Sequence, residues 1–256
     1  MSASLFSRYA SAIRNFSGNT ADEHLVMDRD GPISIHYAPF DYNNEKAKVV
    51  IVGITPGKTQ MVNAIAEARR QMASGVSEDR VLAAAKRTAS FSGAMRPNLI
   101  GLLNKIGLNQ WLGIASCDAL FGSASELVQT TSVLRFPVFV DGENYNGTPN
   151  MLKHPLLRHY VIEHFGKEAQ ILKDAVFVPL GDKVAETLRF LVSQGVIKPN
   201  QVLDGLPHPS GANAERIAYF LGNKSREALS AKTDSLKLDR ARDLLCQQVN
   251  ALSGAS

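Results

Sequence analysis

Short apolar runs of strand length alternate with longer segments of helical periodicity along the chain, and this alternation constrains the fold most. Residues 48–53, which are apolar after Lys48, and residues 175–180 have the apolar runs expected for strands buried on both faces. Residues 130–136 and 201–203 supply two more strands, and residues 33–37 fit an edge strand. Because helical segments separate the buried runs, the pattern predicts an α/β domain with a parallel sheet and right-handed crossovers.

The helical segments are recognised by apolar spacing and by end signals, such as Pro97 in a first turn or Gly107 after a last one. They cover residues 60–72, 78–88, 97–107, 155–165, 182–194, 213–221 and 236–252. The sequence therefore predicts a three-layer α/β/α fold with a central four-stranded, mainly parallel sheet. We expect a single domain over residues 1–256, with a core of about 33–222 and helical extensions at both ends.

Composition excludes several classes of protein. The chain has 256 residues, and because 45% of them are hydrophobic, general disorder is excluded. No apolar run reaches membrane-spanning length, which excludes a transmembrane helix. Its 28 Lys and Arg against 24 Asp and Glu leave a net charge of +4, which permits a polyanionic partner without requiring one. Cys117 and Cys246 are too few for a disulfide framework, a four-cysteine zinc site or a cysteine-ligated iron–sulfur cluster. A reducing compartment, the cytoplasm, is expected.

The N-terminal segment has two interpretations. Arg8 and Arg14 lie among serines and no acidic residue precedes Asp22, which is a pattern shared with transit peptides. The apolar residues between positions 5 and 16 are, however, spaced as on one face of a helix. This spacing favours an amphipathic first helix, and organelle targeting stays open.

The first loop of interest follows the strand at residues 48–53. Gly53 and Gly57 with the following Lys-Thr pair resemble a P-loop, but they enclose three residues where that pattern has four. Pro56 also lacks a backbone N–H, whereas a P-loop binds phosphate through such groups. A nucleoside-triphosphate site is therefore the weaker interpretation. In the alternative, the glycines allow close approach of a ligand and Thr55 directs its hydroxyl into the crevice.

The second loop places His208 between Pro207 and Pro209, after a strand and before a helix. Two prolines restrict the backbone on both sides of the histidine, so its ring is held in one place. Rigid presentation matters when a neutral imidazole donates a hydrogen bond to charge developing on a leaving group. Ser210 and the N–H groups that open the next helix are suited to holding a phosphate.

Taken together, these loops resemble those of the uracil-DNA glycosylase superfamily. A Gly-x-x-Pro-Gly-like motif ends the first core strand of that superfamily, as residues 53–57 do here, and a His-Pro-Ser motif ends the last, as residues 208–210 do. Between them, residues 90–96 resemble the segment bearing the base-stacking aromatic, and residues 131–135 the strand carrying the base-reading residue. Residues 178–181, followed by a helix, match another recurrent segment of the superfamily.

The resemblance implies a DNA glycosylase that flips a damaged or deaminated base, uracil or a related one, into a pocket and hydrolyses its N-glycosidic bond in base-excision repair. In this interpretation His208 stabilises the departing base and Thr55 positions the attacking water, so these two are the catalytic residues. The base would be bound by Gly53, Ile54, Phe91 and Thr131, with Phe91 stacking on it.

The resemblance also implies which residues contact the DNA backbone. These are Pro56, Gly57, Lys58, Arg96, Ser210, Gly211 and Asn213. We expect a monomer that acts on DNA, without a cofactor, a metal or a membrane partner. The iron–sulfur branch of the superfamily is excluded by the cysteine count.

Three positions depart from the superfamily's motifs. Thr55 stands where several branches have Asn or Asp to activate water, and Ile54 stands where another branch has Glu. Thr131 stands where an Asn reads uracil. A hydroxyl orients water but is a poor base, so the alternative is a catalytically impaired member that binds nucleic acid or a nucleobase. Residues 60–88 exceed the usual short connection and predict helices over the mouth of the crevice.

Overall fold

The structure, a computed structural model, describes residues 4–89 and 95–253. The chain divides into two compact units, each assembled from three stretches. Unit 1 takes its described residues from Met1–Asn43, Gly53–Ser90 and Thr130–Ile171, and unit 2 from Asn44–Val52, Phe91–Gln129 and Leu172–Ser256. Because the stretches of the two units alternate along the chain, no single boundary in the sequence separates them.

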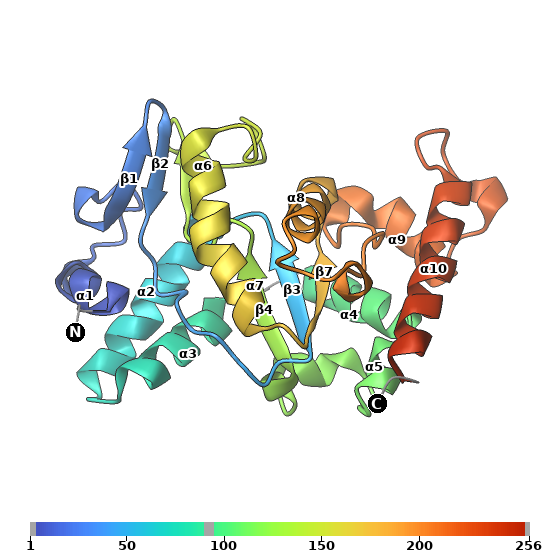
Figure 1. The fold of residues 1–256 in the computed structure, drawn as a ribbon, viewed down its shortest axis with the longest axis horizontal. Coiled ribbons are helices and arrows are strands. Elements are labelled where there is room, and N and C mark those ends of the chain that lie inside the picture. Colours follow the sequence, from blue (N-terminus) through green and yellow to red (C-terminus); the bar gives the residue numbers. More distant parts are fainter. Residues whose placement is uncertain (1–3, 90–94, 254–256) are drawn as a thin grey trace. The chain divides into compact units, whose positions relative to one another are not determined.

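Unit 1 contains a four-stranded antiparallel sheet. Its strands are β1 (Val26–Asp30), β2 (Ile33–His36), β5 (Val138–Val140) and β6 (Glu143–Asn144), in the order β1-β2-β5-β6. The hairpin of β1 and β2 is visible in Figure 1. The strand predicted at residues 33–37 is confirmed as β2, but the prediction that it lies at an edge is wrong, because β1 and β5 pair with it on its two sides. β1 has no sequence signal, because Asp28, Arg29 and Asp30 are exposed polar residues that carry no apolar alternation.

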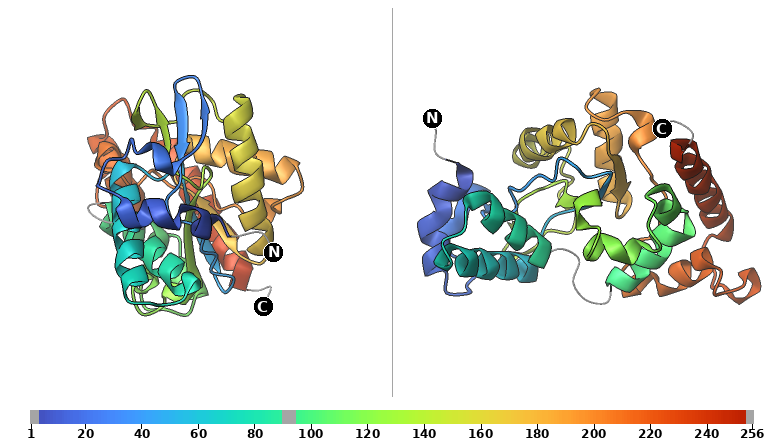
Figure 2. Two further views of the ribbon diagram at one scale, coloured as in Figure 1. Left: turned by 90° about the vertical axis from the view of Figure 1, so that its left-hand side faces the viewer. Right: turned by 90° about the horizontal axis from the view of Figure 1, so that it is seen from below.

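The helices of unit 1 include the two predicted in the segment after the first loop. Its α-helices are α1 (Leu5–Asn15), α2 (Lys58–Ala73), α3 (Glu78–Ala89), α6 (Pro155–Tyr160) and α7 (Lys167–Ile171), with a 3-10 turn at Glu23–Leu25. α2 and α3 pack side by side (Figure 1). α1 contacts α2 (Figure 2), and Arg69 of α2 donates a hydrogen bond to the carbonyl of Phe16 just after α1. The amphipathic first helix is therefore confirmed.

The helix predicted at residues 155–165 continues further than expected. α6 passes through a π-helical turn, Val161–Gly166, into α7. The prediction stops at residue 165, whereas Gly166 is buried within the π turn and does not end the helical segment. The continuation matters because it carries the buried carboxylate of Glu168.

A three-stranded sheet has the order β4-β3-β7. The strands are β3 (Val49–Gly53), β4 (Val128–Ser132) and β7 (Val176–Pro179). β3 and β7 are parallel, with Val49 opposite Val176, and every residue of β7 is buried. The two continuous apolar runs are thus confirmed as buried strands, and the protein is a mixed α/β protein with the predicted parallel pairing.

The prediction of a fourth strand in this sheet is wrong. Residues 201–203 contribute one isolated parallel bridge, between Val202 and Phe177. Gln201 belongs to the 3-10 turn Pro199–Gln201, so only one residue is extended beside β7. The strand predicted at residues 130–136 is also displaced, since β4 covers Val128–Ser132.

The helices of unit 2 lie around those parts of β3, β4 and β7 that belong to unit 2. They are α4 (Met95–Lys105), α5 (Leu108–Trp111), α8 (Asp182–Ser193), α9 (Ala214–Leu221) and α10 (Ser235–Ser253), with 3-10 turns at Cys117–Phe121, Ser125–Leu127, Gly211–Asn213 and Arg226–Ala228. α4 packs against α9, and α10 contacts both α5 and α9 (Figure 2). Gly107 and Gly222 follow α4 and α9 at positive φ, as the sequence predicts. Among the described residues, no helix combines the length and apolar character needed to cross a membrane.

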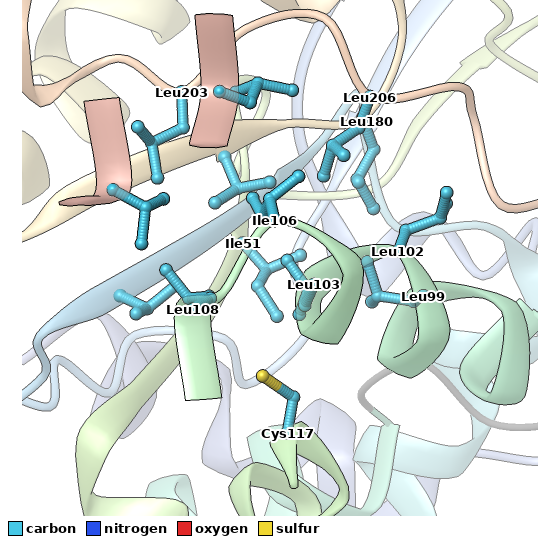
Figure 3. Packing of buried hydrophobic residues seen from close by; sticks show 14 of the residues in the cluster. Ile51, Leu99, Leu102, Leu103, Ile106, Leu108, Cys117, Leu180, Leu203 and Leu206 are labelled. Carbon is cyan, nitrogen blue, oxygen red and sulfur yellow. The ribbon is translucent and has the colours of Figure 1, made fainter. Parts of the chain in front are cut away.

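The core of unit 2 is apolar and closely packed (Figure 3). Ile51 of β3 and Leu99 and Leu103 of α4 are completely buried in it, and each such side chain contributes roughly 1.5–3 kcal/mol through burial. The sulfur of Cys117 points toward Leu103 and Ile51. Burial raises the pKa of this thiol to about 12, so it remains protonated and behaves as a small apolar side chain.

Candidate functional site

His208 is held by its neighbours in the loop between Val202 and α9. Pro207 and Pro209 on either side are buried, whereas His208 itself is half-buried. The backbone N–H of Ser210 donates a hydrogen bond to Nδ1 of the ring across 3.2 Å. Asn98 of α4 fixes the next residue by donating to the carbonyl of Pro209 at 2.9 Å. The sequence prediction of a rigidly presented histidine is confirmed in these contacts.

These contacts determine the protonation state of the ring. Burial lowers the pKa of His208, so the imidazole is neutral near pH 7. A neutral imidazole carries one hydrogen, and because Nδ1 accepts a hydrogen bond, that hydrogen is assigned to Nε2. No hydrogen-bond partner for Nε2 lies among the described residues. His208 therefore presents a neutral N–H donor that is available to a ligand.

Gly181 supports the ring from α8. It precedes α8 with φ +102° and ψ 159°, a conformation in which L side chains are strained. A Cβ at this position would lie 3.5 Å from Cδ2 of His208, which is an ordinary van der Waals distance, so the positive φ and not crowding favours glycine beside the ring. Gly181 belongs to the segment 178–181 that resembles the superfamily, but that resemblance implies no role for it at the site.

His208 lines a cavity of about 800 Å³ in unit 2. This volume lies in the upper part of the range of small-molecule sites. The wall is formed by Gly181, Asp182, Arg189, Asp204, Gly205, Leu206, Pro207, His208, Asn213, Arg216, Lys232, Asp234, Lys237, Leu238 and Ala241. Most of the charged members come from α8, α9 and the start of α10, and no sequence motif contains them.

The residues predicted to contact DNA after His208 form one small network. Gly211–Asn213 is a 3-10 turn that leads into α9. Nδ2 of Asn213 donates to Oγ of Ser210 at 3.3 Å, and Oδ1 of Asn213 accepts from Arg216 at 3.1 Å. The structure thus brings His208, Ser210 and Asn213 together, as the sequence predicts. Their contact with DNA stays a prediction.

The segment expected to stack on a base is known in part. Phe91 lies outside the described residues. Arg96, in the first turn of α4, places its guanidinium 4.9 Å from the ring centroid of Phe121. This cation–π contact anchors Arg96 to unit 2.

Thr55 occupies the loop after β3, in unit 1. Its hydroxyl donates to the carbonyl of Phe136 at 2.9 Å and accepts from the N–H of Val138 at 3.1 Å. Both bonds tie the loop to the segment that leads into β5. Because the single hydroxyl hydrogen is used within the protein, any water at Thr55 would have to donate to the remaining lone pair.

The glycines of the same loop approach protein atoms. A Cβ on Gly57 would lie 3.3 Å from the side chain of Asn144, and a Cβ on Gly53 would lie 3.4 Å from Oγ of Ser132. The N–H of Gly57 donates to Gln60, and the N–H of Lys58 donates to Asn144. The donors that a P-loop directs at phosphate are therefore engaged within the protein.

Three other predicted contact residues in this loop have local explanations. Nζ of Lys58 pairs with Glu143 at 3.1 Å, and Pro56 is buried. The carbonyl of Ile54 accepts a hydrogen bond from the N–H of Leu134. These contacts stabilise the turn, so the roles of Pro56, Lys58 and Ile54 toward DNA or a base stay predictions.

Thr131, the predicted base-reading residue, faces a buried carboxylate. Its hydroxyl donates to Oε2 of Glu168 at 2.7 Å. Oε1 of the same carboxylate accepts from Nζ of Lys86 at 3.3 Å, and Nε of Arg135 lies 3.8 Å from Oε2. Lys86, Arg135 and Glu168 are all buried, so the structure places Thr131 at the edge of an ionic cluster in unit 1.

This cluster also fixes the segment at residues 40–43. Arg135 donates to the carbonyls of Phe40, Asp41 and Tyr42, and Lys86 donates to that of Tyr42 at 2.7 Å. Burial lowers the pKa of Lys86 to about 8, which the charge of Glu168 partly offsets. No sequence motif indicates this cluster, because Lys86, Arg135 and Glu168 are far apart in the chain.

The predicted site residues are thus distributed over both units. Those of residues 53–58 and Thr131 lie in unit 1, whereas Arg96, His208, Ser210, Gly211 and Asn213 lie in unit 2. Among the described residues, no group of three or more His, Cys, Asp and Glu side chains is arranged to hold a metal ion. Within unit 2, the cavity that His208 lines is the candidate functional site.

Comparison with known proteins identifies a relative, whose name does not state an activity. No protein-family model matches the chain, and no solved structure matches it significantly. The chain is 38% identical over 204 residues to a protein of Bacillus subtilis (strain 168) named uncharacterized protein YoxB. The matched region covers 78% of this chain and 79% of that protein. Identity of this extent shows common descent, and the chain belongs to the family of uncharacterized protein YoxB.

Proposed function

We propose that the protein is a monomeric DNA glycosylase-like hydrolase, related to the uracil-DNA glycosylase superfamily, that acts in base-excision repair. The observation that carries this proposal is the state of His208. Its neutral ring has the hydrogen on Nε2, its orientation is fixed by the Ser210 N–H, and it lines a cavity of about 800 Å³. This arrangement suits a group that stabilises a departing nucleobase.

The reaction requires a donor of this kind. When the bond between C1′ of the sugar and the base nitrogen breaks, the electron pair leaves with the base, which becomes an anion. Nε2–H of His208 donates a hydrogen bond to the developing negative charge, and a preorganised donor lowers the barrier because it needs no reorientation. Water adds to C1′, where positive charge develops, and releases its proton to solvent. The base must leave the stack before this bond is accessible, so the proposal includes base flipping.

A second function is favoured by the hydroxyls of Thr55 and Thr131. Both donate to protein oxygens, those of Phe136 and Glu168, so neither is a base for the attacking water. A protein with a leaving-group donor but no base would act slowly, or would bind nucleic acid or a nucleobase without cleaving it. The glycosylase is the first proposal and the binding protein is the second.

A single-turnover assay tests both functions. The protein is incubated in excess with single-stranded and double-stranded oligonucleotides that contain uracil, hypoxanthine or xanthine, and abasic sites are detected by alkaline cleavage. We expect abasic sites on at least one substrate, with a rate at least about a hundredfold lower for His208→Ala. His208→Gln, which retains a donor in a different place, should be intermediate.

The controls separate chemistry from folding. His159→Gln alters a histidine of α6 and should leave the rate unchanged. Binding without abasic sites would support the second function and reject the first. Abasic sites formed equally fast by His208→Ala would show that His208 is not the leaving-group donor.

A further inference from the structure

The cavity that His208 lines has a basic wall that no motif indicated. Arg216 lies on α9, Lys232 lies in the segment between α9 and α10, and Lys237 lies in the first turn of α10. All three side chains are exposed. We call these three residues the basic wall.

The carboxylates described at the cavity form no ion pairs with the basic wall. Three aspartates also line the cavity, but Asp204 pairs with Arg189, and Oδ1 of Asp234 accepts the N–H of Lys237 as a helix cap. Asp182 is exposed at the start of α8. Among the described residues, no carboxylate lies within ion-pair distance of the side chains of the basic wall. Cations gathered around a cavity without such partners favour an anionic ligand.

The segment that carries Lys232 is held in place by one carboxylate. Glu215, in the first turn of α9, accepts hydrogen bonds from Nζ of Lys224 at 2.7 Å and from the N–H and Oγ of Ser230 at 3.1 and 2.6 Å. It also accepts from Oγ1 of Thr233 at 2.6 Å. These bonds lower the pKa of Glu215, so it stays ionised. Four donors on one carboxylate fix the backbone on both sides of Lys232.

The segment is also attached to α10. Oδ2 of Asp239 accepts from the hydroxyl of Tyr219 at 2.9 Å and from Arg226 at 2.8 Å. Nη2 of Arg216 lies 3.5 Å from the carbonyl of Lys232. The basic wall is therefore built on a fixed backbone, and a ligand would lose less free energy in ordering it.

We propose that the basic wall binds the phosphates of a single nucleic-acid strand, with Glu215 as a positioning residue. Cations on three separate segments around about 800 Å³ suit a ligand with two or more phosphates better than a single anion. This inference rests on the proposed function, because a strand at the basic wall would lie along the cavity in which His208 meets the base.

The test is equilibrium binding of a fluorescent, undamaged strand of about twelve thymidines, followed by anisotropy over a series of salt concentrations. Lys232→Gln and Lys237→Gln should each weaken binding about fivefold. Each should also lower the salt slope of log K by about 0.7, the value for one phosphate contact with a single strand. Lys173→Gln, an exposed lysine of unit 2 away from the cavity, should change neither quantity.

Glu215→Gln separates positioning from contact. It should weaken binding while leaving the salt slope within error of the wild-type value, because Glu215 touches no phosphate. Unchanged slopes for both lysine variants would overturn the proposal. Binding of tripolyphosphate that depends on these lysines, without binding of the strand, would overturn the assignment of a nucleic acid.

Failure of this inference is distinguishable from failure of the proposed function. Undamaged strands contain no base to excise, so the binding series does not depend on catalysis. Lysine-dependent binding without abasic sites on any damaged substrate would support the basic wall and reject the glycosylase. If both lysine variants form abasic sites at the wild-type rate and bind the strand with the wild-type affinity, the glycosylase is supported and the basic wall is rejected.

Discussion

The backbone N–H of Ser210 donates to Nδ1 of His208 across 3.2 Å, and this one bond determines which ring nitrogen carries the hydrogen. Protonation at Nδ1 would place two hydrogens against each other and break the bond. The neutral ring is therefore favoured by this contact and by burial together.

The activity should accordingly be constant between pH 8 and pH 6.5. Since burial lowers the pKa of His208 below its usual value near 6.5, the ring becomes charged only at pH values below that. We expect a rate of base release that is flat from pH 8 to pH 6.5 and depends on His208 protonation only at lower pH. Titration of the ring Cε1–H by NMR checks the assignment, and a midpoint above 6.5 would contradict it.

Gly181→Ala should lower both stability and activity. The φ of +102° and ψ of 159° are available to glycine almost alone, so the substitution should cost about 1–3 kcal/mol in unfolding free energy. Relief of that strain would displace the backbone beside His208 and slow base release. Gly195→Ala is the matched control at the other end of α8, because its Cβ would meet open space at φ +70°. It should cost about 1 kcal/mol and leave the rate unchanged.

Glu168→Gln should destabilise the protein strongly. The substitution leaves Lys86 and Arg135 buried without the carboxylate that lies between them, which typically costs roughly 3–5 kcal/mol. Urea unfolding measures the loss. Glu163→Gln removes an exposed pair with Lys167 on the same helical segment and should leave the midpoint unchanged. Equal stability of the two variants would show that the cluster contributes little.

His164 should make stability fall in mild acid. Its ring packs against Phe136 and Tyr160, and burial, with a smaller contribution from Arg135, lowers its pKa to about 4. Between pH 6.5 and 4 the unfolded chain therefore binds more protons than the folded one, so stability is lost as the pH falls through this range.

The size of that effect is measurable against a variant. With allowance for solvent screening of a partly exposed ring, the loss between pH 7 and pH 5 should be about 1 kcal/mol. Urea unfolding of His164→Gln should show a correspondingly smaller pH dependence, whereas His159→Gln should follow the wild type. A pH dependence that His164→Gln leaves unaltered would rule out this residue as the cause.

Periodicity predicted the parts of the fold that are buried on both faces or on one helical face. β3, β7, α2 and α3 follow from their apolar patterns, because burial dictates those residues directly. The exposed polar strand β1 has no such pattern. The expected fourth strand fails because a neighbouring turn leaves only a single bridged residue beside β7.

The sequence predicted only the part of the candidate site in which residues that restrict the backbone are adjacent in the chain. The prolines on both sides of His208 predict a rigid loop from the sequence alone. The pairing of Lys86 with Glu168 joins residues 82 positions apart, and the basic wall joins α9 to the segment before α10. Such proximity depends on tertiary packing, and a single sequence carries no local signal for it.

The interleaving of the two units has a consequence for synthesis of the chain. The last stretch of unit 1 ends at Ile171, so neither unit has all its residues when only the first half of the chain has left the ribosome. Unit 2 needs the final stretch, which includes α10. The early strand β3 must therefore wait for its partners β4 and β7, which are made much later. A cut at one peptide bond would not release either unit as an intact folding body. We expect nascent fragments of this protein to depend on chaperones until α10 emerges.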